Sequence, residues 1–293
     1  MAAEAPVREP APAKINLYLH VTGQRPDGYH LLDSLVVFAN TGDRLEAIPA
    51  DTLKLTHRGP FADALPDPDR NLVMRAAHEM REAFGISAGA HLTLFKNLPV
   101  ASGIGGGSAD AAAAMRALMR LWQINPEDGK IGKIALSLGA DVPVCLISRP
   151  AVMRGIGEEL TLIPAFPELP MVLVNPGVGV STPTVFKARR GDFSPPIDWS
   201  ADATGIQAST AVLDALQQTS NDLQSPAITL TPVIGEVLTA LGEQTGVRLV
   251  RMSGSGATCF ALFEDDAAAY AAAHAIADAH PGWWVQAAQI YGT

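Results

Sequence analysis

A glycine-rich stretch limits what this chain can fold into more than any other feature. Four of the five residues at 103–107 are glycine, and Ser108 follows. The preceding residues 91–96 alternate between apolar and polar side chains, which predicts a strand. The following residues repeat apolar side chains at helical spacing, which predicts an amphipathic helix beginning near Ser108. This order forms an anion site, because glycines let the main chain approach a ligand and a helix N-terminus favours negative charge.

Two well-known phosphate loops do not fit this stretch. A P-loop requires a Gly-Lys pair followed by Ser or Thr, and no lysine follows these glycines. The dinucleotide fingerprint would begin at Gly103 and Gly105, but its third glycine falls on Ser108. We therefore expect a nucleotide phosphate loop of another kind. The alternative is a glycine turn that only connects two elements. The rest of the sequence has to distinguish between these two interpretations.

The composition excludes several classes of protein. The chain has 293 residues, of which 48% are hydrophobic and 17% charged, as expected for one large or two ordinary globular domains. A net charge of −9 argues against a nucleic-acid partner. No apolar run approaches a membrane span, and residues 1–12 lack the apolar core of a secretory signal. We expect a cytoplasmic protein without a membrane partner, with a disordered lead-in at 1–12.

The cysteines and histidines suggest no metal centre. Cys145 and Cys259 each lie in an apolar run that looks like a strand, and we expect buried free thiols. No His or Cys cluster has metal-ligand spacing, so the sequence predicts no metal site on the protein.

The first half of the chain mixes strands and helices. In a predicted strand at 14–21, apolar residues face the core and the alternate residues form a polar face. That polar face consists of Lys14, Asn16, Tyr18 and His20. Further strands are predicted at 31–38, 41–50 and 52–57, and helices at 71–84 and 126–138. Asp141 is predicted to lie in a turn between a helix and an apolar strand at 144–147, where aspartate often serves only local hydrogen bonds.

The second half shows the same irregular alternation. A hairpin is predicted within 151–160, and a helix or turn begins at 182. Strands are expected at 171–174, 249–252, 258–263 and 283–290, and helices at 231–245 and 265–280. Three prolines at 162–170 suggest a boundary between two lobes, 1–161 and 162–293. The pattern predicts the α+β class.

Three stretches together resemble the motifs of the GHMP kinase superfamily, which phosphorylates small alcohols with ATP. They are residues 12–17 (PAKINL), 99–109 and 252–257 (MSGSGA). Within that superfamily, residues 25–30 (RPDGYH) and 139–143 (GADVP) resemble one family. Its members phosphorylate the 2-hydroxyl of cytidine-diphosphate methylerythritol in non-mevalonate isoprenoid synthesis. Order and spacing match from Pro12 to about Phe263.

The resemblance implies a fold and a division of catalytic roles. It implies a two-lobed GHMP kinase-like fold, with an antiparallel-rich mixed sheet and helices in the N-terminal lobe and a ferredoxin-like C-terminal lobe. The active site would lie in the cleft between the lobes. Asp141 would accept the proton of the substrate hydroxyl, and Lys14 would stabilise charge beside it. A nearby cation keeps such a carboxylate ionised.

The resemblance also implies the ligands and their contacts. ATP, accompanied by Mg²⁺, would be held by the glycine loop. The residues of that loop are Pro99, Val100, Ala101, Ser102, Gly103, Ile104, Gly105, Gly106, Gly107, Ser108 and Ala109. The small-molecule substrate would contact Asn16, Tyr29, His30, Thr182 and Phe186, with the aromatic rings on the cytosine. Because a carboxylate repels phosphate, we expect Asp110 to point away from the loop or to act through magnesium.

Two alternatives stay open at this point. The chain could be another GHMP small-molecule kinase, of the homoserine or mevalonate type, although such substrates have no use for the aromatic pair Tyr29 and His30. It could instead be a nucleotide-binding module without catalysis, although Lys14 and Asp141 argue against that. The sequence allows a monomer or a homodimer.

Overall fold

The computed structural model describes residues 5–65, 67, 70–199 and 209–291. Contacts divide the chain into two compact units, each assembled from three segments. Unit 1 contains residues 1–13, 42–100 and 105–148, and unit 2 contains residues 14–41, 101–104 and 149–293. The long strand β3 (His30–Ala50) contributes its second half to unit 1 and its first half to unit 2.

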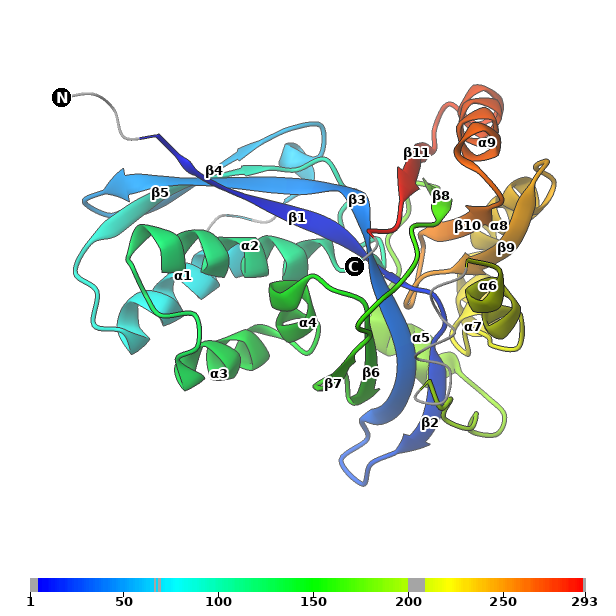
Figure 1. Cartoon of the computed structure of the whole chain (residues 1–293), viewed down its shortest axis with the longest axis horizontal. Helices are drawn as coiled ribbons and strands as arrows, with labels where there is room; N and C mark the ends of the chain where they lie inside the picture. Colours follow the sequence, from blue (N-terminus) through cyan, green and yellow to red (C-terminus); the bar gives the residue numbers. More distant parts are fainter. Residues whose placement is uncertain (1–4, 66, 68–69, 200–208, 292–293) are drawn as a thin grey trace. The chain divides into compact units, whose positions relative to one another are not determined.

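Unit 1 places helices on a sheet. The second half of β3 pairs antiparallel with β5 (Gly89–Phe95), and β4 (Leu53–Arg58) pairs parallel with β5. A 3₁₀ turn, Ala62–Ala64, follows β4. Helices α1 (Leu72–Ala83) and α2 (Gly106–Leu121) lie against this sheet (Figure 1). The alanine-rich side of α2 is buried, and small side chains allow α1 and α2 to pack closely.

Residues 7–12 belong to strand β1 (Val7–Asn16), so the prediction of a disordered lead-in was wrong from Val7 onward. Arg8 pairs with Glu46 at 2.9 Å, and Glu9 is buried in an ion network. The short charged and proline-containing stretch gave no strand pattern, but these side chains find partners in the fold. Residues 1–4 lie outside the described part of the chain.

The predicted strand at 14–21 is divided, and its polar face is not exposed. β1 ends at Asn16, and β2 (His20–Gln24) begins three residues after Leu17. The four residues of the polar face are at most 5% exposed. Alternation separated the two faces correctly, but it could not show that the polar face has hydrogen-bond partners inside the protein.

The first half of β3 lies in unit 2. It pairs antiparallel with β2 and with β6 (Ala151–Gly155), and β6 forms the predicted hairpin with β7 (Glu159–Leu162). The separate strands expected at 31–38 and 41–50 are therefore one strand.

The rest of unit 2 has the ferredoxin-like topology that the resemblance implied. Along the chain the elements are β8 (Pro170–Asn175), α8 (Val233–Gly242), β9 (Val247–Met252), β10 (Cys259–Phe263), α9 (Asp266–Ala279) and β11 (Trp284–Gln289). The sheet order is β11-β8-β10-β9, and all its pairs are antiparallel. Helices α8 and α9 pack on this sheet (Figure 1). This βαββαβ order is the split βαβ motif.

Three helices are inserted between β8 and α8. They are α5 (Thr182–Ala188), α6 (Ser209–Gln217) and α7 (Gln224–Leu230). The sequence pattern did not single out α6. Side chains from α7 and α8 share a buried cluster with the sheet, which includes Leu223, Ile234 and Phe263.

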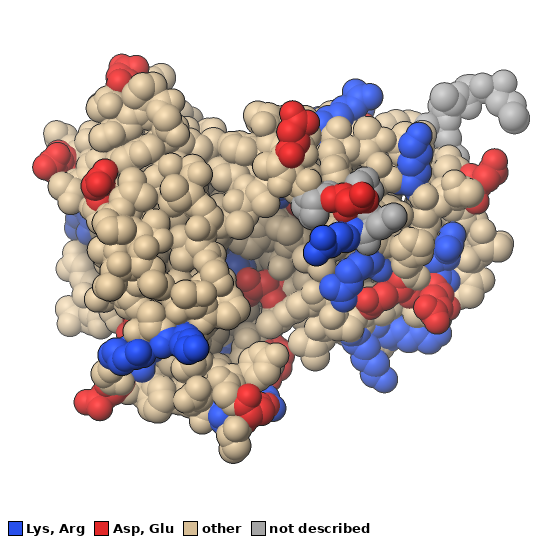
Figure 2. Space-filling view, turned by 180° about the vertical axis from the view of Figure 1, so that it is seen from behind, with Lys and Arg blue, Asp and Glu red and all other residues tan. Residues whose placement is uncertain are grey.

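The surface and the thiols agree with a globular protein. Each described helix is too short or too polar to cross a lipid bilayer. On the face drawn in Figure 2, acidic and basic side chains are interspersed among uncharged ones. Cys145 and Cys259 are both buried free thiols, as predicted, and burial raises the pKa of Cys259.

Candidate active site

The glycine loop joins β5 to α2, as predicted, and α2 begins at Gly106 rather than near Ser108. Gly103 has φ 77° and Gly105 φ 65°, in the left-handed region that favours glycine. Gly103, Gly105, Gly106 and Ser108 are partly exposed, so this main chain is accessible to a ligand. The first N–H groups of a helix lack partners within it, which makes this end of α2 suitable for an anion.

In unit 2, the loop residues Ser102–Ile104 are fixed by main-chain hydrogen bonds. Lys14 N donates to Ile104 O at 3.0 Å, and Thr258 N donates to Ser102 O at 3.0 Å. A Cβ on Gly103 would lie 2.5 Å from the carbonyl oxygen of Gly256, so only glycine fits there. The loop is thus held between β1 and the second glycine turn, residues 253–257.

Buried Ser253 connects the same pieces through its side chain. Its Oγ accepts from Asn16 N at 3.1 Å and donates to Gly103 O at 3.2 Å. Asn16 Nδ2 donates to Ser34 Oγ at 2.8 Å. In the described part of the chain, Asn16 Oδ1 belongs to the few buried side-chain oxygens without a hydrogen-bond partner. That acceptor suits a hydroxyl group of a ligand.

Two of the predicted cytosine contacts lie together. The rings of His30 and Phe186 are stacked, with centroids 5.0 Å apart and an angle of 25° between their planes. Burial, and then the positive charge of Arg189, lower the pKa of His30 below its ordinary value. The neutral ring is therefore favoured in the folded protein.

The last two substrate candidates, Thr182 and Tyr29, have different surroundings. Thr182 Oγ1 lies 2.7 Å from Ser255 Oγ, so α5 is tied to the second glycine turn. Tyr29 sits at the tip between β2 and β3, with 61% of its surface exposed. The sequence singled out the second glycine turn as a motif, but it gave Ser253 and Ser255 no individual role and offered no signal for Arg189.

Asp141 lies in unit 1, and its surroundings correct the sequence prediction. The apolar run after it is not a strand but helix α4 (Val142–Ile147), and Asp141 is its N-cap residue. Cys145 N donates to Asp141 O at 3.1 Å, which closes the first helical turn. Pro143 at the start of the helix costs no hydrogen bond there. Asp141 is partly exposed, while Val142, Val144 and Cys145 of the helix are buried. Helix α3 (Gly129–Leu138) precedes it.

A buried ion cluster, which we call the lysine clamp, lies under the start of α2. It consists of Lys96, Asp43 and Asp110. Lys96 Nζ donates to Asp43 Oδ2 at 2.5 Å and to Asp110 Oδ2 at 2.7 Å. Asp43 Oδ1 also accepts from the main-chain N of Asn97 and of Leu98, which lead into the loop.

The clamp answers the question of where Asp110 points. Its Oδ2 accepts from Lys96 Nζ, whereas its buried Oδ1 has no hydrogen-bond partner within the described residues. Burial raises the pKa of Asp110; Lys96 lowers it, and Asp43 raises it further. Burial opposes the charge of Lys96, but Asp110 and Asp43 outweigh burial and raise its pKa. A Cβ on Gly106 would lie 3.1 Å from Lys96 Nζ, so the lysine runs directly beneath the helix start.

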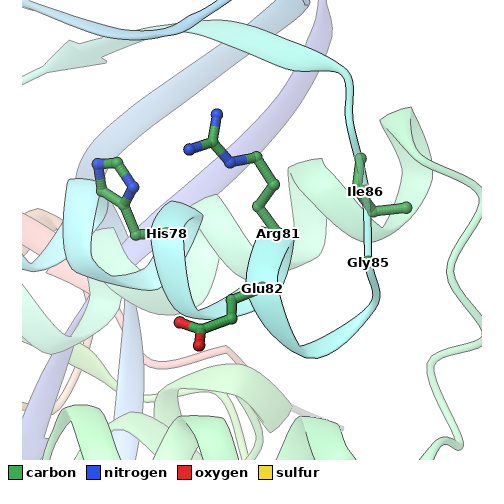
Figure 3. A pocket seen from close by; sticks show the side chains of 5 residues that line it. All are labelled: His78, Arg81, Glu82, Gly85 and Ile86. Carbon is green, nitrogen blue, oxygen red and sulfur yellow. The ribbon is translucent and has the colours of Figure 1, made fainter.

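A pocket on α1 is separate from the predicted site residues. It is lined by His78, Arg81, Glu82, Gly85 and Ile86. Figure 3 shows His78 and Arg81 pointing to one side of α1 and Glu82 to the other. Its side chains therefore do not converge on one point.

Comparisons with known proteins define the class. Residues 71–149 match the model "GHMP kinases N terminal domain", and residues 208–282 match "GHMP kinases C terminal". A homoserine kinase structure from Cytophaga hutchinsonii has a TM-score of 0.74 at 20% identity, over 99% of this chain and 96% of its own. That likeness concerns the fold. Fold and family models together define a GHMP kinase, a small-molecule kinase that uses ATP.

More similar relatives narrow the family. A protein of Paramagnetospirillum magneticum is 53% identical over 96% of this chain and 97% of its own. A protein of Cereibacter sphaeroides is 56% identical over 96% of this chain and 98% of its own. Both are named 4-diphosphocytidyl-2-C-methyl-D-erythritol kinase. A crystal structure of 4-(cytidine 5'-diphospho)-2C-methyl-D-erythritol kinase is 36% identical, with a TM-score of 0.80, over 98% of this chain and 100% of its own. The chain belongs to the GHMP kinases, in the family of these 4-diphosphocytidyl-2-C-methyl-D-erythritol kinases.

Proposed function

We propose that this chain transfers the γ-phosphate of ATP to the 2-hydroxyl of 4-diphosphocytidyl-2-C-methyl-D-erythritol, a step of non-mevalonate isoprenoid precursor synthesis. The observation that carries the proposal is the 53% and 56% identity to relatives of that name over 96% of the chain. The accessible glycine loop and the His30–Phe186 stack support it. We retain from the sequence the inference of a cytoplasmic monomer or homodimer with neither a nucleic-acid nor a membrane partner.

The glycine loop is the proposed triphosphate site. Its left-handed glycines and the first turn of α2 offer main-chain N–H groups to phosphate oxygens. Mg²⁺ would accompany the ATP and neutralise charge on the phosphates. Within the described residues no three His, Cys, Asp or Glu side chains gather around a common point, and Asp110 is bound to Lys96. These residues fit a magnesium ion held mainly by phosphates and water.

Asp141 is the proposed base and Lys14 the proposed charge stabiliser. As the N-cap residue of α4, Asp141 is held at a defined position and is partly exposed. It accepts the proton of the attacking hydroxyl as the new oxygen–phosphorus bond forms and the bond between the γ-phosphorus and the leaving ADP breaks. Lys14 is held in β1, where its main-chain N donates to Ile104 O of the loop, and it stabilises negative charge at the transition state.

The proposed substrate contacts divide by chemistry. His30, Phe186 and Tyr29 hold the cytosine by stacking and hydrogen bonding. Asn16 and Thr182 contact the alcohol or the diphosphate, and the unpartnered Oδ1 of Asn16 supports a hydroxyl ligand.

Steady-state rates with competing alcohols test the substrate. We expect an ADP-release assay to give a kcat/KM for the cytidylyl alcohol at least about 100-fold above those for mevalonate and homoserine. A preference for either of the smaller alcohols would discard the assignment.

Asp141→Asn tests the base. We expect kcat to fall by at least about 100-fold, with little change in ATP affinity, because a positioned base contributes 10²–10⁴-fold. Asp128→Asn is the matched control. Asp128 caps α3 by accepting from Lys130 N at 2.9 Å, and Asn can make the same bond. If Asp141→Asn stayed within about tenfold of wild type, the base would have been assigned wrongly.

A further inference from the structure

Arg116 makes a set of contacts that the reaction as described does not use. Arg116 lies in the second half of α2, beyond the first turn of the helix at Gly106. Its Nη1 donates to Cys145 O at 2.9 Å and to Leu146 O at 3.3 Å. Its Nη2 donates to Pro10 O at 2.5 Å. One guanidinium thus joins α2, β1 and the last turn of α4, all within unit 1.

These contacts satisfy groups that a short helix cannot satisfy itself. The last carbonyls of a helix have no partner within it, and a cation at that end is favoured by the dipole. Helix α4 has only six residues, so its position depends on contacts with its neighbours. Arg116 binds the end of α4 opposite to Asp141. Ser148 Oγ adds a bond to Cys145 O at 2.6 Å.

Glu9 fixes the arginine from the other side. Its carboxylate accepts from Arg116 Nε at 3.1 Å and from Arg120 Nη1 at 2.7 Å. Glu9 is 8% exposed, and the Arg116 side chain 19%. A guanidinium held by one carboxylate and three carbonyls has little freedom to move. It therefore fixes the position of α4 relative to α2 and β1.

We infer that Arg116 is a positioning residue for phosphoryl transfer, which holds α4 on α2 so that Asp141 keeps a fixed place relative to the first turn of α2. The inference rests on the proposed role of Asp141. Removing the guanidinium takes the donated bond from Leu146 O, leaves Cys145 O with the bond from Ser148 Oγ, and lets the helix shift. A shift of about 1 Å at a reacting group can cost on the order of 100-fold in rate.

The test compares Arg116→Met with Arg120→Met. Arg120 lies one turn further along α2, pairs with the same Glu9 and is 63% exposed. We expect Arg116→Met to lower kcat by at least about tenfold while the KM for ATP stays within about twofold, because only the base is displaced. Arg120→Met should leave both kcat and the KM for ATP within about twofold of the wild-type values. Arg116→Lys, which keeps a cation at the carbonyls, should retain more of kcat than Arg116→Met.

The same substitutions made in the Asp141→Asn variant distinguish an effect that acts through Asp141 from a loss of activity that affects the whole protein. If Arg116 acts through Asp141, Arg116→Met should lower the residual kcat by less than about threefold there, since coupled residues are not additive. An equal loss in both backgrounds, or a wild-type kcat for Arg116→Met, would overturn the inference. A normal rate for Asp141→Asn alone would refute the base assignment instead, so the two failures are distinguishable. If Arg116→Met does not fold, Arg116→Lys replaces it in the double-mutant cycle with Asp141→Asn. The inference is then overturned if Arg116→Lys has the kcat of the wild type and its effect simply adds to that of Asp141→Asn.

Discussion

At the scale of single residues, the charge beside His30 has a measurable consequence. Burial and the guanidinium of Arg189 both lower the pKa of this histidine, so the fold favours the neutral ring that stacks on Phe186. We expect Arg189→Gln to raise the pKa of His30 toward its ordinary value. The measurement is an NMR titration of the His30 ring. Arg190→Gln is the control, because Arg190 is exposed and binds only local carbonyls in the described contacts.

The sign of the effect on stability follows from the same shift. A histidine with a lowered pKa binds its proton more readily in the unfolded chain, so its contribution to stability is lost as the pH falls through its ordinary value. Arg189→Gln should therefore weaken the dependence of stability on pH in that acidic range. An unchanged titration in Arg189→Gln, or an equal shift in Arg190→Gln, would show that the guanidinium has no part in it.

At the scale of elements, the sequence predicted the strand–loop–helix unit well and α4 badly. Residues 91–96 and the helix after the glycines show clear periods of two and 3.6, and both elements formed. The run at 144–147 has four apolar residues, which fits a buried strand or a buried helix equally well. Contacts distant in sequence decide such cases. The lysine clamp was hidden for the same reason, since 53 residues separate Asp43 from Lys96.

The lysine clamp gives the prediction at this scale. Lys96→Met would leave Asp43 and Asp110 facing each other in a buried place without their cation, and we expect a loss of about 3–5 kcal/mol in the free energy of unfolding. Adding Asp110→Asn should recover part of that loss, because it removes a buried acid group that would otherwise face Asp43 without a cation. Urea denaturation measures both. Lys133→Met, at an exposed position of α3, should change stability by no more than about 0.5 kcal/mol. Equal costs for the two lysines would mean that the clamp contributes nothing.

At the scale of the whole molecule, the chain does not divide into two consecutive blocks of contacts. The boundary at 161/162 is a prediction from prolines, and the family models fall on either side of it. By contacts, however, unit 2 includes residues 14–41 together with 149–293. Leu19 N donates to Ser220 O at 3.0 Å, and Val21 N to Asp222 Oδ2 at 2.8 Å. Local patterns along the sequence carry no information about such pairings.

These contacts predict how fragments behave. Buried Arg251 donates to Leu17 O at 2.6 Å and to groups of residues 216–219, and burial lowers its pKa to about 10. In a fragment of residues 162–293 the guanidinium would lose its acceptor on Leu17, and apolar side chains now covered by residues 14–41 would be exposed. We therefore expect this fragment alone to give a poorly dispersed NMR spectrum and no cooperative melting, because its apolar cluster loses Leu19 and Val21 and the buried guanidinium loses one of its acceptors. Co-expression with residues 1–161 should restore both properties, since it supplies the missing strand. A well-dispersed spectrum from the isolated fragment would show that the interactions within 162–293 suffice to order it.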